Sequence, residues 1–185
     1  MSLEYAILGF LNYHPFTGYD LKKAFDSSVR HFWPADQSQI YRTLADLTNH
    51  NWAEMKIVEQ TDRPDRKVYR ITTAGRAALR KWLLEPQPPK DNRNPLLMQI
   101  FFAGQLSDAE ALPIFERVAE QLRASLATYD AISQKDDLAA EYSDSPREFF
   151  FWMVTLEAGR VSAKANLKLV ETVVQQIRDK EVPQK

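Results

Sequence analysis

The sequence predicts a mainly α-helical protein in two parts, and three observations support this fold class. The chain has 185 residues, a length that fits one or two domains. Residues 85–95 (EPQPPKDNRNP) contain four prolines and no large apolar side chain, which is typical of a linker or long turn. Before this segment the pattern mixes helix and strand, whereas after it the pattern is helical almost throughout. We expect a first domain over residues 1–88 with a small β-hairpin, and an all-helical second domain over 95–180.

Composition excludes several classes of protein. The chain has no cysteine, which excludes a disulfide scaffold, a thiolate metal site and a cysteine nucleophile. The three histidines are scattered, and no set of His, Asp and Glu has the spacing of a metal site. The sequence has no glycine-rich phosphate loop and no nucleophile elbow, so we expect neither a cofactor nor an enzyme. No apolar run approaches the roughly 18 residues of a membrane span, and no signal peptide is evident, so we expect a cytoplasmic protein.

Two short helices are predicted at the start of the chain. Residues 3–12 are apolar on most sides, which suits a short buried helix. Thr17 and Asp20 then have the spacing of a capping box, in which two side chains satisfy the free amides of a helix start. The second helix is therefore expected over about residues 18–29.

A third helix is predicted over about residues 37–50, with one apolar and one polar face. Asp36 is its expected N-cap, and Gln39 stands in the reciprocal capping position. Apolar residues recur at the spacing of one helical face: Ile40, Leu44 and Leu47. The other faces are rich in hydrogen-bonding side chains but poor in Lys and Glu, whereas a helix that only faces solvent usually carries Lys/Glu pairs. This composition favours a recognition surface.

Two short strands and a fourth helix are predicted next. Residues 53–60 and 67–71 alternate in part between apolar and polar side chains, which is typical of strands. Between them, residues 61–66 have the proline and aspartates of a turn. Residues 72–75 then open a helix that continues to about residue 84.

The order helix, helix, helix, hairpin, helix describes a winged helix-turn-helix. Residues 30–81 carry ten Lys or Arg and six Asp or Glu, a net charge of +4. The third helix fits a DNA major groove, about 12 Å wide, and the hairpin would contact phosphate or the minor groove. The arginines of the turn alternate with Asp62 and Asp65, so we expect the turn to be partly self-neutralised.

Three stretches resemble signatures of PadR-family transcriptional regulators and occur in the same order and spacing. They are residues 14–21 (HPFTGYDL), residues 32–44 (FWP, then QIYRTL) and residues 67–75 (KVYRITTAG). The second half resembles, in helical pattern and length, the dimerisation region of the longer PadR subfamily, which includes phenolic-acid-responsive repressors and virulence activators. Where the family usually has glycine before the wing, this chain has Asn51, which tolerates the left-handed conformation needed there.

The resemblance implies a set of DNA contacts. The third helix would lie at or near the DNA surface, the second would reach phosphate, and the hairpin would form the wing contacts. The implied residues are Gln37, Ser38, Gln39, Tyr41, Arg42 and Thr43 on the third helix, Lys22 and Lys23 on the second, and Arg63, Arg66 and Lys67 in the wing. Tyr69 and Thr72 also match the motif, and we expect structural roles for both.

Two further helices are predicted in the second part. Residues 107–110 form a capping box for a helix from about 108 to 135, and residues 145–148 start a long helix to about 179. Apolar residues along the long helix alternate in steps of four and three, as in a coiled-coil seam. Because the first part is too small to cover this seam, we expect a homodimer. Its predicted interface residues are Phe149, Met153, Leu156, Leu167, Val170, Val174 and Ile177.

Several aromatic residues are candidates for an effector pocket. The family resemblance implies that a small aromatic or hydrophobic molecule binds there. The candidate residues are Trp82, Phe101, Phe102, Tyr129, Phe150 and Trp152. Alternatively, the same side chains form the core of a domain or dimer interface. The four consecutive aromatic residues 149–152 are too continuous for one helical stripe, so some must face a partner, a pocket or water.

The sequence therefore predicts a homodimeric transcriptional regulator that binds a double-stranded DNA operator, with repression as the default action and a possible small aromatic effector. Two alternatives remain open. One is an activator of the same family that needs no ligand, and the other is a winged-helix protein-interaction module that binds no DNA. The sequence pI of about 6.3 slightly favours the second alternative, whereas the Lys-poor third helix and the helical seam disfavour it.

Overall fold

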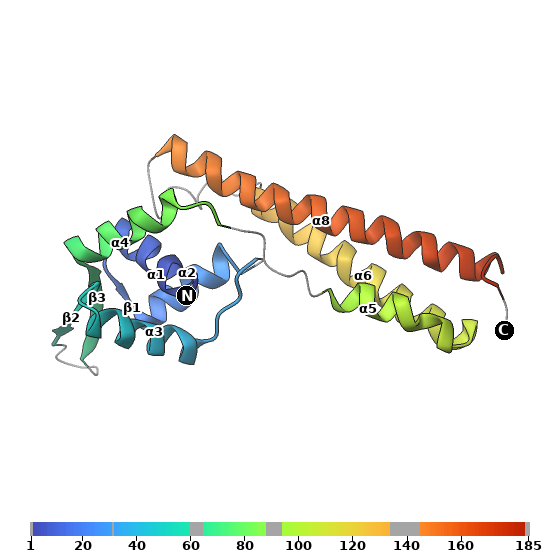
Figure 1. Ribbon diagram of the computed structural model, residues 1–185, viewed down its shortest axis with the longest axis horizontal. Helices are drawn as coiled ribbons and strands as arrows, with labels where there is room; N and C mark the ends of the chain where they lie inside the picture. The colour runs from blue at the N-terminus through green and yellow to red at the C-terminus, as the bar shows by residue number, and fades with distance from the viewer. Residues whose placement is uncertain (1, 31, 60–64, 88–93, 134–144, 184–185) are drawn as a thin grey trace. The chain divides into compact units, whose positions relative to one another are not determined.

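The chain forms two compact units, Met1–Pro88 and Pro89–Lys185, here called the N-terminal and C-terminal units. A computed structural model describes residues 2–30, 32–59, 65–87, 94–133 and 145–183 (Figure 1). No helix within these ranges is long and apolar enough to cross a membrane.

The N-terminal unit is a winged helix-turn-helix, as predicted. Its described elements are α1 (Ser2–Tyr13), β1 (Phe16–Thr17), α2 (Gly18–Ser27), α3 (Gln37–Asn49), β2 (Ala53–Val58), β3 (Arg66–Ile71) and α4 (Thr73–Leu84). The three strands form one antiparallel sheet in the order β1-β3-β2, and β2 and β3 form the wing hairpin. Helix α2 ends two residues before the predicted position, and β1 was not predicted from the sequence.

The core of this unit lies between its first three helices. Their buried apolar residues are Ile7, Leu8, Phe10 and Leu11 of α1, Leu21, Ala24 and Phe25 of α2, and Ile40, Leu44 and Leu47 of α3. The apolar face of α3 is therefore turned inward, as its spacing predicted, and its polar face is left for the surface.

Local hydrogen bonds fix the helix starts at the predicted residues. The Thr17 hydroxyl oxygen accepts a bond from the Asp20 amide, and Asp36 and Gln39 form a reciprocal capping box. Asn51 has a positive φ of 57°, so it adopts the left-handed conformation that the family glycine would supply. Thr72 caps α4 and also donates a hydrogen bond to the Asn51 carbonyl at 2.6 Å, which gives it a structural role.

The described C-terminal unit is entirely helical. It consists of α5 (Pro95–Phe102), the short 3-10 helix η1 (Ala103–Gln105), α6 (Asp108–Ser133) and α8 (Pro146–Arg178). Helices α6 and α8 lie side by side and antiparallel (Figure 1). Three ion pairs follow this register: Arg178–Glu116, Arg123–Glu171 and Arg160–Asp130. Both long helices begin where their capping sequences predicted.

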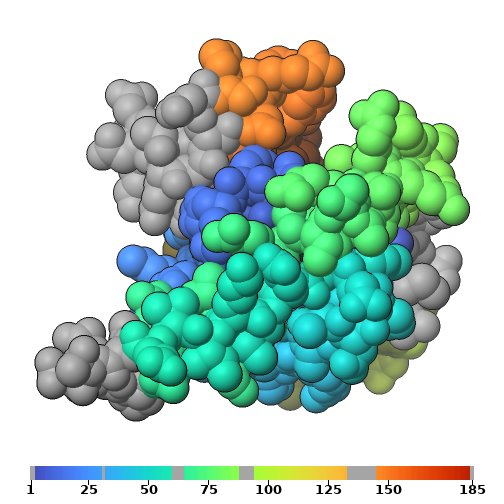
Figure 2. All heavy atoms as spheres, turned by 90° about the vertical axis from the view of Figure 1, so that its left-hand side faces the viewer, coloured from blue at the N-terminus to red at the C-terminus, as the bar shows by residue number. Residues whose placement is uncertain are grey.

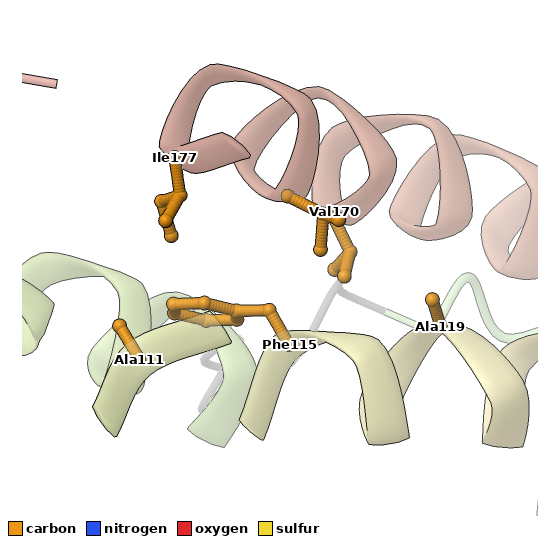
Figure 3. Packing of buried hydrophobic residues seen from close by; sticks show 6 residues of the cluster. Ala111, Phe115, Ala119, Val170 and Ile177 are labelled. Atoms are coloured by element: carbon orange, nitrogen blue, oxygen red, sulfur yellow. The ribbon is translucent and has the colours of Figure 1, made fainter. Parts of the chain in front are cut away.

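The predicted dimer seam of α8 is in part an intrachain core, which corrects the sequence-based interpretation. Val170, Val174 and Ile177 pack against Ala111, Phe115 and Ala119 of α6, with the Phe115 ring at the centre (Figure 3). Leu156 is also buried within the chain. The prediction overlooked that α6, with 26 residues, is itself long enough to cover the seam. Of the predicted interface residues, Phe149 is exposed, and Met153 and Leu167 are half-buried.

Candidate nucleic-acid interface

The polar face of α3 forms an exposed surface on the N-terminal unit. Of its predicted DNA-contacting residues, Thr43 is half-buried, and the others are exposed: Gln37, Ser38, Gln39, Tyr41 and Arg42. The surfaces of α3 (cyan) and of the wing hairpin (teal) lie side by side in Figure 2, in agreement with the contacts between α3 and β2. A helix and a hairpin thus present one continuous face.

The helix start already uses two of these side chains. The Ser38 hydroxyl donates to the Asp36 carboxylate at 2.7 Å, and the Gln39 side chain accepts from the Asp36 amide at 3.0 Å. The hydrogen bonds from Ser38 and from the Gln39 amide lower the pKa of the Asp36 carboxyl, so it stays ionised. Within the described residues, Gln37 and Arg42 have no such side-chain bonds, which leaves them available to a ligand.

Tyr41 is partly committed to packing. Gly18 begins α2 against its ring, since a Cβ at Gly18 would lie 2.5 Å from the nearest ring carbon. Burial raises the pKa of Tyr69, and the neighbouring Tyr41 raises it further. Tyr41 therefore holds α3 against α2 and the sheet, although its side chain is still 41% exposed.

The described cations of the wing lie on both faces of the hairpin. Because side chains alternate along β3, Arg66 and Lys67 point to opposite sides. The register of the hairpin places Lys56 and Arg70 on the same side as Arg66, a feature the sequence analysis missed. The alternation of the strands could have revealed it. Arg63, also predicted to contact DNA, lies outside the described residues.

Two of the predicted phosphate contacts are ion-paired within the unit. Lys22 pairs with Asp26 one turn along α2, whereas Lys23 is exposed. Arg66 of the wing pairs with Asp20 of α2 at 3.0 Å, although 46 residues separate them. No local pattern could have indicated this second pair.

The candidate effector residues belong to both units, and those of the C-terminal unit do not gather at one place within it. Trp82 belongs to the N-terminal unit and stacks on Tyr5, with ring centroids 4.9 Å apart. Phe101 and Phe102 follow Ile100, which packs near the end of α8, against the cluster that contains Val170. The remaining candidates are Tyr129 on α6 and Phe150 and Trp152 on α8.

The spacing along α8 separates these groups. Trp152 stands 18 residues before Val170, about 27 Å along the helix at 1.5 Å per residue. Phe101 and Phe102 therefore lie far from Phe150 and Trp152 within the C-terminal unit. Among the described residues, no three His, Asp or Glu side chains cluster in a way that could hold a metal ion.

Comparison with known proteins gives matches over both units. The transcriptional regulator PadR-like family matches residues 7–81, and the virulence activator alpha C-terminal family matches residues 92–178. A probable transcriptional regulator of Mycobacterium tuberculosis is 46% identical over 89 residues, which cover 48% of this chain and 47% of that relative. The negative transcriptional regulator PadR of Bacillus subtilis is 30% identical over 158 residues, which cover 84% of this chain and 87% of that relative.

Solved structures extend the similarity to the whole fold. Bacillus subtilis PadR in complex with operator DNA superposes with a TM-score of 0.82 at 28% identity, covering 96% of this chain and 99% of that one. The same protein in complex with p-coumaric acid superposes with a TM-score of 0.73 over the same shares. The Vibrio cholerae virulence activator AphA shares the fold, with a TM-score of 0.71 at 24% identity over 96% of this chain and 99% of AphA.

Proposed function

We propose a function for this chain on one premise: it belongs to the transcriptional regulator PadR-like family. The chain binds a pseudo-palindromic DNA operator as a homodimer and represses transcription from it. The chain acts by binding DNA and not by catalysis. It acts in the cytoplasm, where the DNA is. Bacillus subtilis PadR is a negative regulator, and its structure has been solved in complex with operator DNA. Both facts support the proposal that this chain binds an operator and represses transcription.

The observation that carries this proposal is the continuous face of α3 and the wing. Arg42 and Gln37 are exposed side chains that can donate to base edges in a major groove. Lys23 on α2 and Lys67 on the wing flank this helix as exposed cations, which suits them to phosphate contacts. In this proposal α3 reads sequence, while α2 and the wing set its register on the duplex.

The C-terminal unit is proposed to join two copies. Its α5 and the start of α8 leave large apolar side chains exposed: Leu97, Met98, Phe101, Phe102, Phe149, Phe150, Phe151 and Val154. Exposed apolar surface of this kind marks an interaction site. A two-fold dimer would bring two α3 helices to half-sites about one DNA turn apart.

A small aromatic acid is the proposed effector class. The support is the complex of Bacillus subtilis PadR with p-coumaric acid, together with the exposed or half-buried rings of this C-terminal unit. The candidates there are Phe101, Phe102, Tyr129, Phe150 and Trp152. Because these rings lie far apart within one chain, we expect such a pocket to use only some of them. An activator without a ligand is the second candidate within the family.

A mobility shift with the purified chain tests the proposal. The DNA is the region upstream of its own gene, and the titration uses salt, random-sequence competitor and then p-coumaric acid. We expect a shift that resists competitor and weakens steeply with salt. A chain that shifts neither this DNA nor any fragment from a genomic selection would instead support a winged-helix protein-interaction module.

Arg42→Ala is expected to weaken operator binding by about 1–3 kcal/mol, because a bidentate contact to a base edge is worth that much. The affinity for random-sequence DNA should fall less, because the lost contact is one to a base edge of the operator. Arg117→Ala is the matched control, because Arg117 is an exposed arginine on α6 of the C-terminal unit. Equal operator affinity of Arg42→Ala and the control would remove Arg42 from the interface.

A further inference from the structure

The wing arginine Arg66 is a candidate contact for DNA phosphate, but a carboxylate of the same chain already pairs with it. Its guanidinium donates to the Asp20 carboxylate at 3.0 Å, and the two side chains are 49% and 42% exposed. Both groups remain within reach of solvent and of a third charged group. The pair therefore links the wing to the start of α2 without being buried.

The carboxylate of Asp20 cannot follow Arg66 if the arginine moves. The oxygen that accepts from Arg66 also accepts a hydrogen bond from the Thr17 hydroxyl, at 2.7 Å. The Asp20 amide in turn donates to the Thr17 hydroxyl oxygen at 3.1 Å. Asp20 also stands in the first turn of α2, where the helix dipole favours a negative charge. A phosphate that approaches Arg66 must therefore displace this fixed carboxylate or lie beside it.

Lys67, the next residue of β3, provides a contrast. It is exposed on the opposite side of the hairpin, and no ion pair holds it in the part of the chain that the structure describes. Arg66 is thus neutralised by a carboxylate of the same chain, whereas no described carboxylate pairs with the adjacent Lys67 on the other side of the hairpin.

We propose that Asp20 competes with DNA phosphate for Arg66, and so lowers the affinity of the N-terminal unit for DNA of any sequence. This inference rests on the proposed DNA binding. Charge neutralisation supplies most of the affinity for random DNA, so masking one wing cation limits that affinity. The Asp20 carboxylate thus weakens DNA binding, and removal of its charge strengthens the complex with DNA.

The experiment measures binding of the full chain to a random-sequence duplex at several salt concentrations. Asp20→Asn removes the charge but keeps an oxygen that can accept from Thr17. We expect about two- to fivefold tighter binding at the lowest salt, the range of an exposed ion pair. We also expect a salt slope steeper by up to about 0.9, which corresponds to one more phosphate contact.

Substitution of Arg66, the other residue of the ion pair, gives an independent measurement. Arg66→Gln is expected to weaken random-sequence binding less than Lys67→Gln does, because Asp20 already neutralises Arg66. In the Asp20→Asn background, Arg66→Gln should abolish the gain. Glu171→Gln is the matched control, because it removes one charge and breaks the exposed Arg123–Glu171 pair in the C-terminal unit. It should not change binding.

Two results would overturn the inference while leaving the proposed function intact. One is a wild-type chain that binds DNA and an Asp20→Asn variant that binds equally or more weakly, as loss of a purely structural helix cap would produce. The other is an Arg66→Gln variant that loses as much affinity as Lys67→Gln. A wild-type chain that binds neither operator nor random DNA would overturn both proposals.

Discussion

Two glycines show how single residues decide where the elements of the N-terminal unit meet. A Cβ at Gly75 would lie 2.1 Å from the Trp52 carbonyl oxygen and 2.9 Å from the Ile71 side chain. The Trp52 carbonyl belongs to the turn before β2 and accepts from the Thr72 amide, so it cannot easily move. Only a residue without a side chain lets α4 start this close to the turn. Gly9 of α1 has nothing within 4 Å of the same position.

Gly75→Ala and Gly9→Ala are therefore expected to change stability in opposite directions. Gly75→Ala should lower the free energy of unfolding by about 1–3 kcal/mol, as overpacking does. Gly9→Ala should raise it by about 0.5–1 kcal/mol, because alanine favours a helix where space is open. Urea unfolding followed by tryptophan fluorescence measures both. A Gly75→Ala variant with an unchanged free energy of unfolding would show that the turn at Trp52 moves to make room for the methyl group.

The residue scale also shows which contacts a sequence can predict. The caps at Asp36 and Thr17 and the left-handed Asn51 were predicted, because each depends on side chains within a few residues. The pairs Asp20–Arg66 and Gly18–Tyr41 were not predicted, because they depend on how distant elements pack. The bond from Ser38 to Asp36 could have been noticed alongside the predicted cap by Gln39, since Asp36 lies two residues before Ser38.

At the scale of elements, strong periodicity and caps predicted six helices and the wing hairpin, but among the described residues they missed the short elements β1, α5 and η1. The two-residue β1 exists because β3 pairs with it, and nothing in Phe16–Thr17 itself indicates a strand. Helix α5 has the sequence PLLMQIFF, whose apolar residues leave little helical period to detect. The apolar stripe of α8 was identified correctly. Its spacing does not show which element packs against it, and α6 is one such element.

The packing of α8 on α6 predicts unequal effects of one substitution at two positions of α8. Val170 is fully buried beside Phe115, whereas Val161 is exposed. Val170→Ala should lower the free energy of unfolding of the C-terminal unit by about 2–3 kcal/mol, from lost burial and a cavity. Val161→Ala should change it by less than about 0.5 kcal/mol.

Hydrogen exchange of the α6 and α8 amides measures this effect separately from the N-terminal unit. Protection should fall in α6 and α8 of Val170→Ala, while the amides of α1 and α3 stay protected, because the two units are separately compact. Equal protection in Val170→Ala and Val161→Ala would contradict the packing shown in Figure 3.

At the scale of the whole molecule, the exposed apolar residues of the C-terminal unit need an explanation. The intrachain core uses the side of α8 that carries Val170 and Ile177, and leaves Phe150, Phe151 and Val154 exposed. A second copy would cover this second side, so the proposed dimer no longer depends on the seam predicted from the sequence. In this proposal the C-terminal unit pairs the two copies and the N-terminal unit binds the DNA.

Phe150→Glu and Val154→Glu are expected to convert the dimer to a monomer, because each places a charge in an apolar interface. Sedimentation velocity measures the change in mass. Operator affinity should fall about a hundredfold or more in both variants, since a monomer engages one half-site and loses the second, intramolecular contact. Leu84→Glu is the control, because Leu84 is an exposed apolar residue at the end of α4. If both variants sediment as the wild-type dimer and still bind the operator, two copies must meet through another surface.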